Sequence, residues 1–176
     1  MSKVSRSAEF RPLNIAVLTV SDSRTRADDR SGDTLEELAT SAGHRVVQRR
    51  IVADEQGLLE EQFRNWIQDD SIEVVLSTGG TGVTGRDVTP EALLAVVEKA
   101  IPGFGELFRW QSYAKIGTST IQSRAVAGVA NGTYLFALPG STGACRDAWE
   151  GILKEQLDSR HRPCNFAELL PRLRER

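Results

Sequence analysis

Residues 72–89 read IEVVLSTGGTGVTGRDVT, and this stretch decides the fold class. Residues 72–78 form an apolar, β-branched run, which is typical of a strand buried on both faces of a parallel sheet. Three glycines follow within four residues, and Thr89 and Pro90 then favour a helix over residues 90–99, with Thr89 as its cap. A buried strand that passes through a glycine-rich loop into a helix predicts an α/β domain.

The same alternation continues on both sides of this stretch. Residues 14–20 (NIAVLTV) and 45–52 predict two more strands. Residues 33–42 predict a helix with Asp33 as its N-cap, and residues 55–68 predict another. The second of these helices carries an apolar stripe: Leu58, Leu59, Phe63, Trp66 and Ile67.

The C-terminal half adds a hairpin between helices. Residues 103–113 and 144–157 predict helices, the latter with Ser141 as its cap. Residues 125–130 and 133–138 flank Asn131-Gly132, a strong signal for an antiparallel hairpin. We therefore expect a three-layer α/β/α sandwich with a mostly parallel sheet and one antiparallel hairpin, as a single domain over residues 13–176. Residues 1–12 are polar and predict a flexible N-terminal arm.

Composition restricts the classes of function. The chain has 176 residues, and its formal net charge of −2 gives no reason to expect nucleic-acid binding. Its apolar runs are strand-sized and no signal peptide is evident, so we expect no membrane association and a cytoplasmic location with reduced thiols at both cysteines, Cys145 and Cys164. Only His44 and His161 are available as histidines, so acid–base or metal chemistry falls to carboxylates.

The glycine-rich loop is the sharpest candidate site. Thr78, Gly79, Gly80, Thr81 and Gly82 follow a buried strand, at the sheet edge where α/β proteins bind ligands. Glycines permit close approach of the main chain, and exposed amides bind phosphate. A tight turn without a ligand is the alternative. Neither the Walker A pattern nor GxGxxG is present.

Charged residues surround this loop in the sequence. Arg86 suits an oxyanion, and Asp87 suits a hard cation such as Mg²⁺ or, alternatively, a helix cap. Asp22, Asp33 and Asp54 follow strands or open helices, and as a set they predict a divalent metal between carboxylates and phosphate.

Three further segments leave alternatives open. Pro139, Gly140 and Ser141 form a second turn, which either binds an anion or only caps a helix. The ring of Phe104, between two glycines, covers either a planar ligand or a neighbouring side chain. Arg124 binds an anion or forms a surface ion pair.

Several of these motifs together resemble the molybdopterin-binding MoaB/MogA family and the G domain of gephyrin. The motifs are STGGTG (77–82), RDVTPEA (86–92), PGFGELFR (102–109), QSRAVAG (122–128) and LPGST (138–142). The LPGST turn and the tail RHRPCNF resemble the MoaB branch in particular.

The resemblance implies a biosynthetic role in the molybdenum cofactor pathway. It implies that the chain binds molybdopterin as substrate or ligand and adenylylates it with ATP and Mg²⁺. Asp54 and Asp87 match the catalytic, magnesium-holding aspartates of the family. The substrate and nucleotide loops match Ser21, Asp22, Thr78, Gly79, Gly80, Thr81, Gly82, Arg86, Pro139, Gly140 and Ser141.

Two alternatives stay open within the resemblance. The chain is either an adenylyltransferase or a non-catalytic molybdopterin carrier, and it is a homo-oligomer for which a hexamer is favoured over a trimer. Whether another enzyme shares the reaction, and whether molybdenum or tungsten is the final metal, is left open. A general sugar- or nucleotide-phosphate enzyme would share the glycine loop but not PGFGE with LPGS.

Overall fold

The computed structural model describes residues 3–4 and 8–175. A six-stranded sheet forms the centre, in the order β3-β2-β4-β7-β6-β5. Its strands are β2 (Asn14–Val20), β3 (Arg45–Val52), β4 (Val74–Thr78), β5 (Lys99–Ala100), β6 (Val126–Ala130) and β7 (Thr133–Leu138). The β3-β2-β4-β7 pairings are parallel, and the β7-β6 and β6-β5 pairings are antiparallel. The mostly parallel sheet with an antiparallel hairpin is therefore confirmed.

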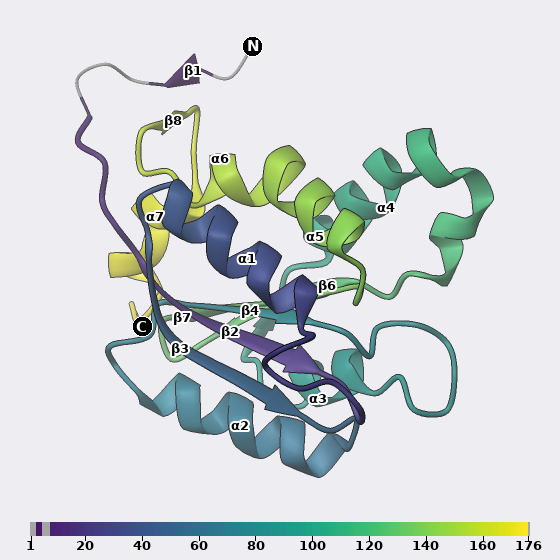
Figure 1. The fold of residues 1–176 in the computed structure, drawn as a ribbon. Helices are drawn as coiled ribbons and strands as arrows, with labels where there is room; N and C mark the ends of the chain where they lie inside the picture. Colours follow the sequence, from purple (N-terminus) through teal and green to yellow (C-terminus); the bar gives the residue numbers. More distant parts are fainter. Residues whose placement is uncertain (1–2, 5–7, 176) are drawn as a thin grey trace.

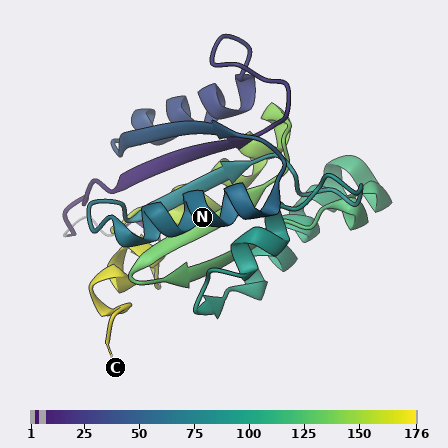
Figure 2. The same ribbon diagram turned by 90° about the horizontal axis from the view of Figure 1, so that it is seen from below.

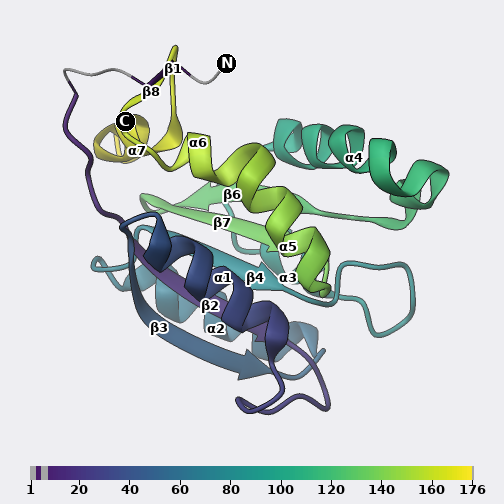
Figure 3. The same cartoon turned by 45° about the horizontal axis from the view of Figure 1, so that its top comes forward.

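Helices cover both faces of the sheet (Figure 1). One face carries α1 (Arg30–Ser41), α4 (Pro102–Ile116), α5 (Thr142–Ala148) and α6 (Lys154–Gln156), and Figure 3 looks onto it. The other carries α2 (Gln56–Gln68) and α3 (Thr89–Leu94), seen from below in Figure 2. A π-helical segment, Trp149–Leu153, joins α5 to α6. The remaining elements are β1 (Lys3–Val4), β8 (His161–Arg162), α7 (Phe166–Leu169) and the 3-10 helices Gly117–Gln122 and Leu170–Arg172.

Alternate side chains of the sheet build two cores. Ile15 and Val17 of β2 belong to the cluster beneath α1 and α5, whereas Ala16 and Leu18 belong to the cluster with α2 and α3. All four are fully buried. Because successive side chains of a strand point to opposite faces, a run that is apolar throughout needs cover on both sides. The three-layer sandwich follows.

Helix α1 begins earlier than its sequence pattern predicted. Its N-cap is Asp29 and not Asp33, so that prediction was wrong. The Asp29 carboxylate accepts a hydrogen bond from the Gly32 amide (3.0 Å) and is fully buried against Thr19 and Arg49. A buried ion pair between distant segments fixes this helix start, and no local spacing signals it.

Other predicted elements also shift. The helix predicted over residues 90–99 ends at Leu94, because Lys99 and Ala100 pair with β6 instead. Thr89 is not a cap but the first helical residue. Leu58 was placed wrongly in the apolar stripe of α2, since it is 45% exposed. The hairpin is confirmed, with φ of 44° at Asn131 and 82° at Gly132.

The range predicted as an N-terminal arm lies partly outside the described residues, namely 1–2 and 5–7. Within it, Lys3 and Val4 pair antiparallel with β8, and Arg11 forms an ion pair with Glu73. In the described part of the chain, each helix is too short or too polar to cross a lipid bilayer.

Candidate functional site

Three loops meet at one edge of the sheet. They follow β2 (residues 21–29), β4 (residues 79–88) and β7 (residues 139–141), which are adjacent strands. Because these strands are parallel, their carboxyl ends share an edge, which lies toward the right in Figures 1 and 3. This is where ligands bind in open α/β sheets. Nearly all of the predicted site residues lie on these loops.

The Gly79–Gly80 turn needs glycine at both positions. Their φ values are 108° and 63°. A Cβ on Gly79 would lie 2.2 Å from the Val20 carbonyl oxygen, and one on Gly80 would lie 2.4 Å from Thr89 Oγ1. The turn therefore packs against β2 and α3 more closely than any side chain permits.

The carbonyl groups of residues 79–82 are each held by a hydrogen bond from within the protein. Thr89 Oγ1 donates to Gly79 O (2.9 Å) and Thr89 N to Gly80 O (3.0 Å). Arg124 N donates to Thr81 O (3.0 Å) and Arg124 Nε to Gly82 O (2.6 Å). In a planar trans peptide the next amide points away from the carbonyl. The amides after each of these carbonyls therefore turn away from Thr89 and Arg124, as an anion-binding loop requires.

The side chain of Asp87 folds back over this loop. Its carboxylate accepts hydrogen bonds from Thr84 N (2.8 Å) and Thr84 Oγ1 (2.6 Å), and it lies beside Gly82. Burial alone would raise the pKa of Asp87, but hydrogen bonds from Thr84 and from the Gly82 amide, with the charge of Arg124, outweigh burial and hold the pKa below its usual range. Asp87 is therefore ionised at neutral pH.

Asp54 lies in a more negative environment. Burial raises the pKa of Asp54, and the charges of Asp22 and Asp87 raise it further, against the opposing charge of Arg86. A Cβ on Gly80 would lie 2.8 Å from Asp54 Oδ1, so this carboxylate lies against the glycine turn. A carboxylate in such surroundings gains from a cation.

Asp22 and Arg86 join the loops after β2 and β4. Arg86 Nη2 donates to both carboxylate oxygens of Asp22 (2.7 and 2.9 Å), and Asp54 N donates to the same carboxylate (3.0 Å). The hydrogen bonds from Arg86 and from Asp54 N lower the pKa of Asp22. Arg86 was predicted to hold an anion, and in this structure its anionic partner is Asp22.

A cavity of about 420 Å³ lies between the glycine loop and the turn after β7. Its lining residues are Gly79, Gly80, Thr81, Gly82, Asp87, Gln122, Ser123, Pro139, Gly140 and Ser141. Gln122 and Ser123 were not predicted as site residues. Both residues precede β6, which runs antiparallel to β7. The amino end of an antiparallel strand lies at the same edge as the carboxyl ends of its parallel neighbours, and this rule could have identified Gln122 and Ser123.

Three predicted residues also shape the backbone around this cavity: Ser141 lines it, whereas Thr78 and Ser21 do not. Thr78 is buried, and its hydroxyl donates to Pro139 O (3.0 Å), which links the glycine loop to the turn after β7. Ser141 caps α5 by accepting from Ala144 N (3.1 Å). Ser21 Oγ accepts from the amides of Ser23 and Arg24 (3.3 and 3.2 Å), so it shapes its own loop.

Some alternatives from the sequence are resolved here. Asp33 does not join the other carboxylates, because it forms ion pairs with Arg26 and Arg49, and the described residues contain no group of three or more metal-ligating side chains. The Phe104 ring packs edge-on against Phe136 and is buried. Of the two alternatives for Arg124, the surface ion pair is confirmed, with Glu91 as its partner, and the same side chain also donates to the carbonyl oxygens of Gly82 and Asp87.

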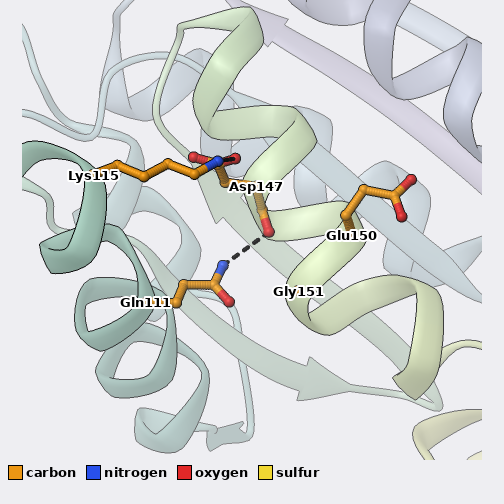
Figure 4. Close-up of a pocket in the computed structure, with 5 residues that line it drawn as sticks. All are labelled: Gln111, Lys115, Asp147, Glu150 and Gly151. Carbon is orange, nitrogen blue, oxygen red and sulfur yellow. Dashed lines mark hydrogen bonds and ion pairs between the residues drawn. The ribbon is translucent and has the colours of Figure 1, made fainter. Parts of the chain in front are cut away.

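A second cavity of about 280 Å³ lies between α4 and the π-helical segment (Figure 4). Gln111 Nε2 donates to the Asp147 carbonyl oxygen (2.8 Å), and Lys115 forms an ion pair with the Asp147 carboxylate. A Cβ on Gly151 would lie 2.2 Å from Gln111 Oε1. These contacts connect α4 to α5, and no predicted site residue lines this cavity.

Comparison with known proteins identifies the family of this chain. The profile of the family described as "Probable molybdopterin binding domain" matches residues 16–159. The chain is 55% identical over 166 residues to molybdenum cofactor biosynthesis protein B of Escherichia coli (strain K12), covering 94% of this chain and 96% of that protein. It is 42% identical over 151 residues to the protein of the same name from Staphylococcus carnosus (strain TM300), covering 84% and 88%.

Solved structures agree with the sequence comparison. A crystal structure of molybdenum cofactor biosynthesis protein B aligns with a TM-score of 0.81 at 40% identity, over 84% of this chain and 92% of that chain. The tungsten cofactor synthesizing protein MoaB of Pyrococcus furiosus aligns with a TM-score of 0.72 at 31% identity, over 94% and 99%. The chain therefore belongs to the MoaB proteins of the molybdopterin-binding domain family.

Proposed function

We propose that this protein binds molybdopterin and ATP at the glycine-loop cavity and transfers AMP to molybdopterin. A phosphate oxygen of molybdopterin attacks the α-phosphorus of ATP, a P–O bond forms, and the bond to the departing pyrophosphate breaks. The observation that carries the proposal is the loop of residues 79–82, whose carbonyls are held by Thr89 and Arg124. The Gly79 amide donates to Leu138 O and the Gly82 amide to the Asp87 carboxylate, so the amides of Gly80 and Thr81 are the ones proposed to receive phosphate oxygens. Phosphoryl-type transfer needs such positioning and little covalent work by the protein.

The carboxylates of Asp54 and Asp87 fit a magnesium ion held jointly with ATP. Mg²⁺ prefers one or two carboxylates together with substrate phosphates, which accords with two aspartates beside a phosphate loop. The raised pKa of Asp54 supports this, because burial and the charges of Asp22 and Asp87 disfavour an uncompensated carboxylate there. When bound, the ion neutralises negative charge on the reacting phosphates. Asp87 is held in place by Thr84, so it offers a fixed oxygen.

The test is release of pyrophosphate and formation of adenylylated molybdopterin from molybdopterin, ATP and Mg²⁺. We expect turnover by the wild type and a loss on the order of a hundredfold or more in Asp54→Asn and Asp87→Asn, as for loss of a group that stabilises transition-state charge. Asp70→Asn is a matched control, because Asp70 is exposed and forms an ion pair with Arg174, away from the glycine loop in the sequence. Normal turnover by Asp87→Asn would refute the role of this carboxylate. Saturable molybdopterin binding without product would instead support the carrier function.

We further propose that the protein is a homo-oligomer, with a hexamer favoured, and that α4 contributes to the interface. Five large apolar side chains of α4 and the following 3-10 helix are between 44% and 77% exposed: Leu107, Trp110, Tyr113, Ile116 and Ile121. A cluster of this kind is typical of interaction surfaces. Light scattering is expected to give a multimer for the wild type and smaller species for Trp110→Glu. Leu58→Glu, on α2, should leave the assembly unchanged, and equal masses for all three proteins would contradict the assignment.

A further inference from the structure

Arg124 connects both ends of the loop that follows β4. Its main-chain amide donates to Thr81 O (3.0 Å), and its side-chain Nε donates to Gly82 O (2.6 Å). Nη2 donates to Asp87 O (2.7 Å). Nη1 forms an ion pair with Glu91 on α3. One residue, two positions before β6, therefore holds the beginning of the loop, its end and the helix beyond it.

These contacts determine which groups the loop presents. A carbonyl oxygen directed at a bound phosphate would repel it, whereas an amide attracts it. Arg124 holds the carbonyls of Thr81 and Gly82 on its own side, so the amides of the next residues face the opposite way. The carbonyl of Asp87 is fixed in the same manner, and this fixes the main chain from which the Asp87 carboxylate extends.

The guanidinium is already engaged and does not act as an anion ligand. Nε, Nη1 and Nη2 all have partners within the protein, and the side chain is 34% exposed. A lysine ammonium, as a single point charge, cannot reproduce a planar group that bridges two carbonyls and a carboxylate. The geometry therefore requires arginine and not merely a positive charge.

We propose that Arg124 is a positioning residue, which fixes the Gly82 amide and the Asp87 carboxylate that accepts from it, two neighbouring groups of the cavity wall. This inference rests on the proposed adenylyl transfer for its catalytic consequence. Its structural part, the restraint of the loop, is independent of that function. Arg124 would act through Gly82 and Asp87 and would not touch the reacting atoms.

The restraint is tested by hydrogen–deuterium exchange of peptides from residues 82–89, where the amides of Thr84, Asp87 and Thr89 are hydrogen-bonded. We expect exchange about tenfold faster or more in Arg124→Ala, as for loss of at least one charge-assisted hydrogen bond. Arg124→Lys should behave like Arg124→Ala. Glu91→Gln, which removes the ion pair but keeps the carbonyl contacts, should change exchange much less. Peptides from β2 report global unfolding and should be unaffected.

The catalytic part is tested on the same variants with molybdopterin, ATP and Mg²⁺. We expect Arg124→Ala to lower kcat by at least about tenfold and to raise the Mg²⁺ concentration for half-maximal turnover, since Asp87 is displaced. A role in stability alone would not move the Mg²⁺ dependence. Unchanged loop exchange in Arg124→Ala, or faster exchange with unchanged kcat and Mg²⁺ dependence, would overturn the proposal.

A protein that binds molybdopterin without adenylylating it would refute the proposed transfer but not the positioning role of Arg124. If the wild type binds molybdopterin but forms no product, the readout becomes the molybdopterin Kd of the wild type and of Arg124→Ala. A Kd at least about tenfold weaker in the variant, together with faster loop exchange, would support positioning without catalysis. An equal Kd would overturn the proposal, whatever the exchange rate.

Discussion

Replacing Gly82 by alanine should displace the Asp87 carboxylate while leaving the fold intact. A Cβ at residue 82 would lie 2.8 Å from Asp87 Oδ2, 3.1 Å from its Cγ and 3.2 Å from Oδ1. Ordinary van der Waals contact begins near 3.4 Å, so the carboxylate must retreat by about 0.6 Å at its nearest oxygen. The φ of Gly82 is outside the left-handed region, so the substitution adds no main-chain strain.

The expected effect on activity is much larger than the effect on stability. Weakening the two hydrogen bonds from Thr84 to Asp87 costs about 1–2 kcal/mol, and the reduced freedom of the unfolded chain offsets about 0.4–1 kcal/mol. A net loss near 1 kcal/mol leaves a folded protein. A misplacement of about 1 Å can reduce a rate about a hundredfold, so we expect turnover to fall between about tenfold and a hundredfold.

Gly85→Ala is the matched control in the same loop, because nothing lies within 4 Å of its Cβ position and its φ is not positive. The assay is pyrophosphate release at saturating ATP, with urea denaturation of each variant for stability. Gly85→Ala should keep wild-type turnover. Wild-type turnover in Gly82→Ala would refute the reasoning, because a displaced Asp87 would then have no effect on the reaction.

Two further predictions concern stability. His44 accepts a hydrogen bond from Leu13 N through Nδ1, and burial lowers its pKa from 6.5 to about 4 against the charge of Asp158, so the unfolded chain binds the proton first as pH falls. The free energy of unfolding should therefore be fully retained above about pH 6.5 and fall toward pH 4, by on the order of 2 kcal/mol between pH 7 and 5. Urea denaturation of His44→Asn should lack this pH dependence. An equal slope in both proteins would exclude His44 as its origin. Asp29→Ala should lower the free energy of unfolding by about 3 kcal/mol, because it removes the cap of α1 and a buried partner of Arg49. A loss below about 1 kcal/mol would show that the ion pairs with Asp33 and Glu36 are enough to compensate the charge of Arg49.

The sheet could be predicted because its signals are local. The runs at residues 14–20 and 72–78 are mostly apolar, with Thr19, Ser77 and Thr78 as their buried polar members, and Asn131-Gly132 supplies the positive φ values of a tight hairpin. Strand β2 and the hairpin strand β7 match their predicted bounds, while β4 and β6 begin two residues and one residue late.

The misplaced elements depend on contacts between distant residues. The segment of residues 90–99 has helical composition, yet its C-terminal end pairs with β6. Val97 packs so closely on Gly128 that a Cβ at residue 128 would lie 2.6 Å from Val97 Cγ1. The start of α1 depends on Arg49 from β3. Neither partner can be identified from spacing along the chain.

The candidate site was predicted where it follows parallel strands and missed where it does not. The loops after β4 and β7 could be assigned because parallel strands bring their carboxyl ends together. Strand β6 runs the opposite way, so its amino end brings Gln122, Ser123 and Arg124 to that edge. The sequence left the partner of Arg124 open, because main-chain carbonyls carry no residue-specific signal.

The ion pair between Asp22 and Arg86 gives the arginine of the loop after β4 a counter-ion from the loop after β2. Both side chains are about half exposed, at 47% and 59%, and such pairs contribute only about 0–1 kcal/mol. An incoming phosphate can therefore take the place of Asp22 at Arg86 at little cost in free energy. Because Asp54 N also binds the Asp22 carboxylate, this exchange would be transmitted to the strand end that carries Asp54. Under the proposed function, phosphate binding and the electrostatic environment of the Asp54 carboxylate would be coupled, and the coupling should weaken as ionic strength rises.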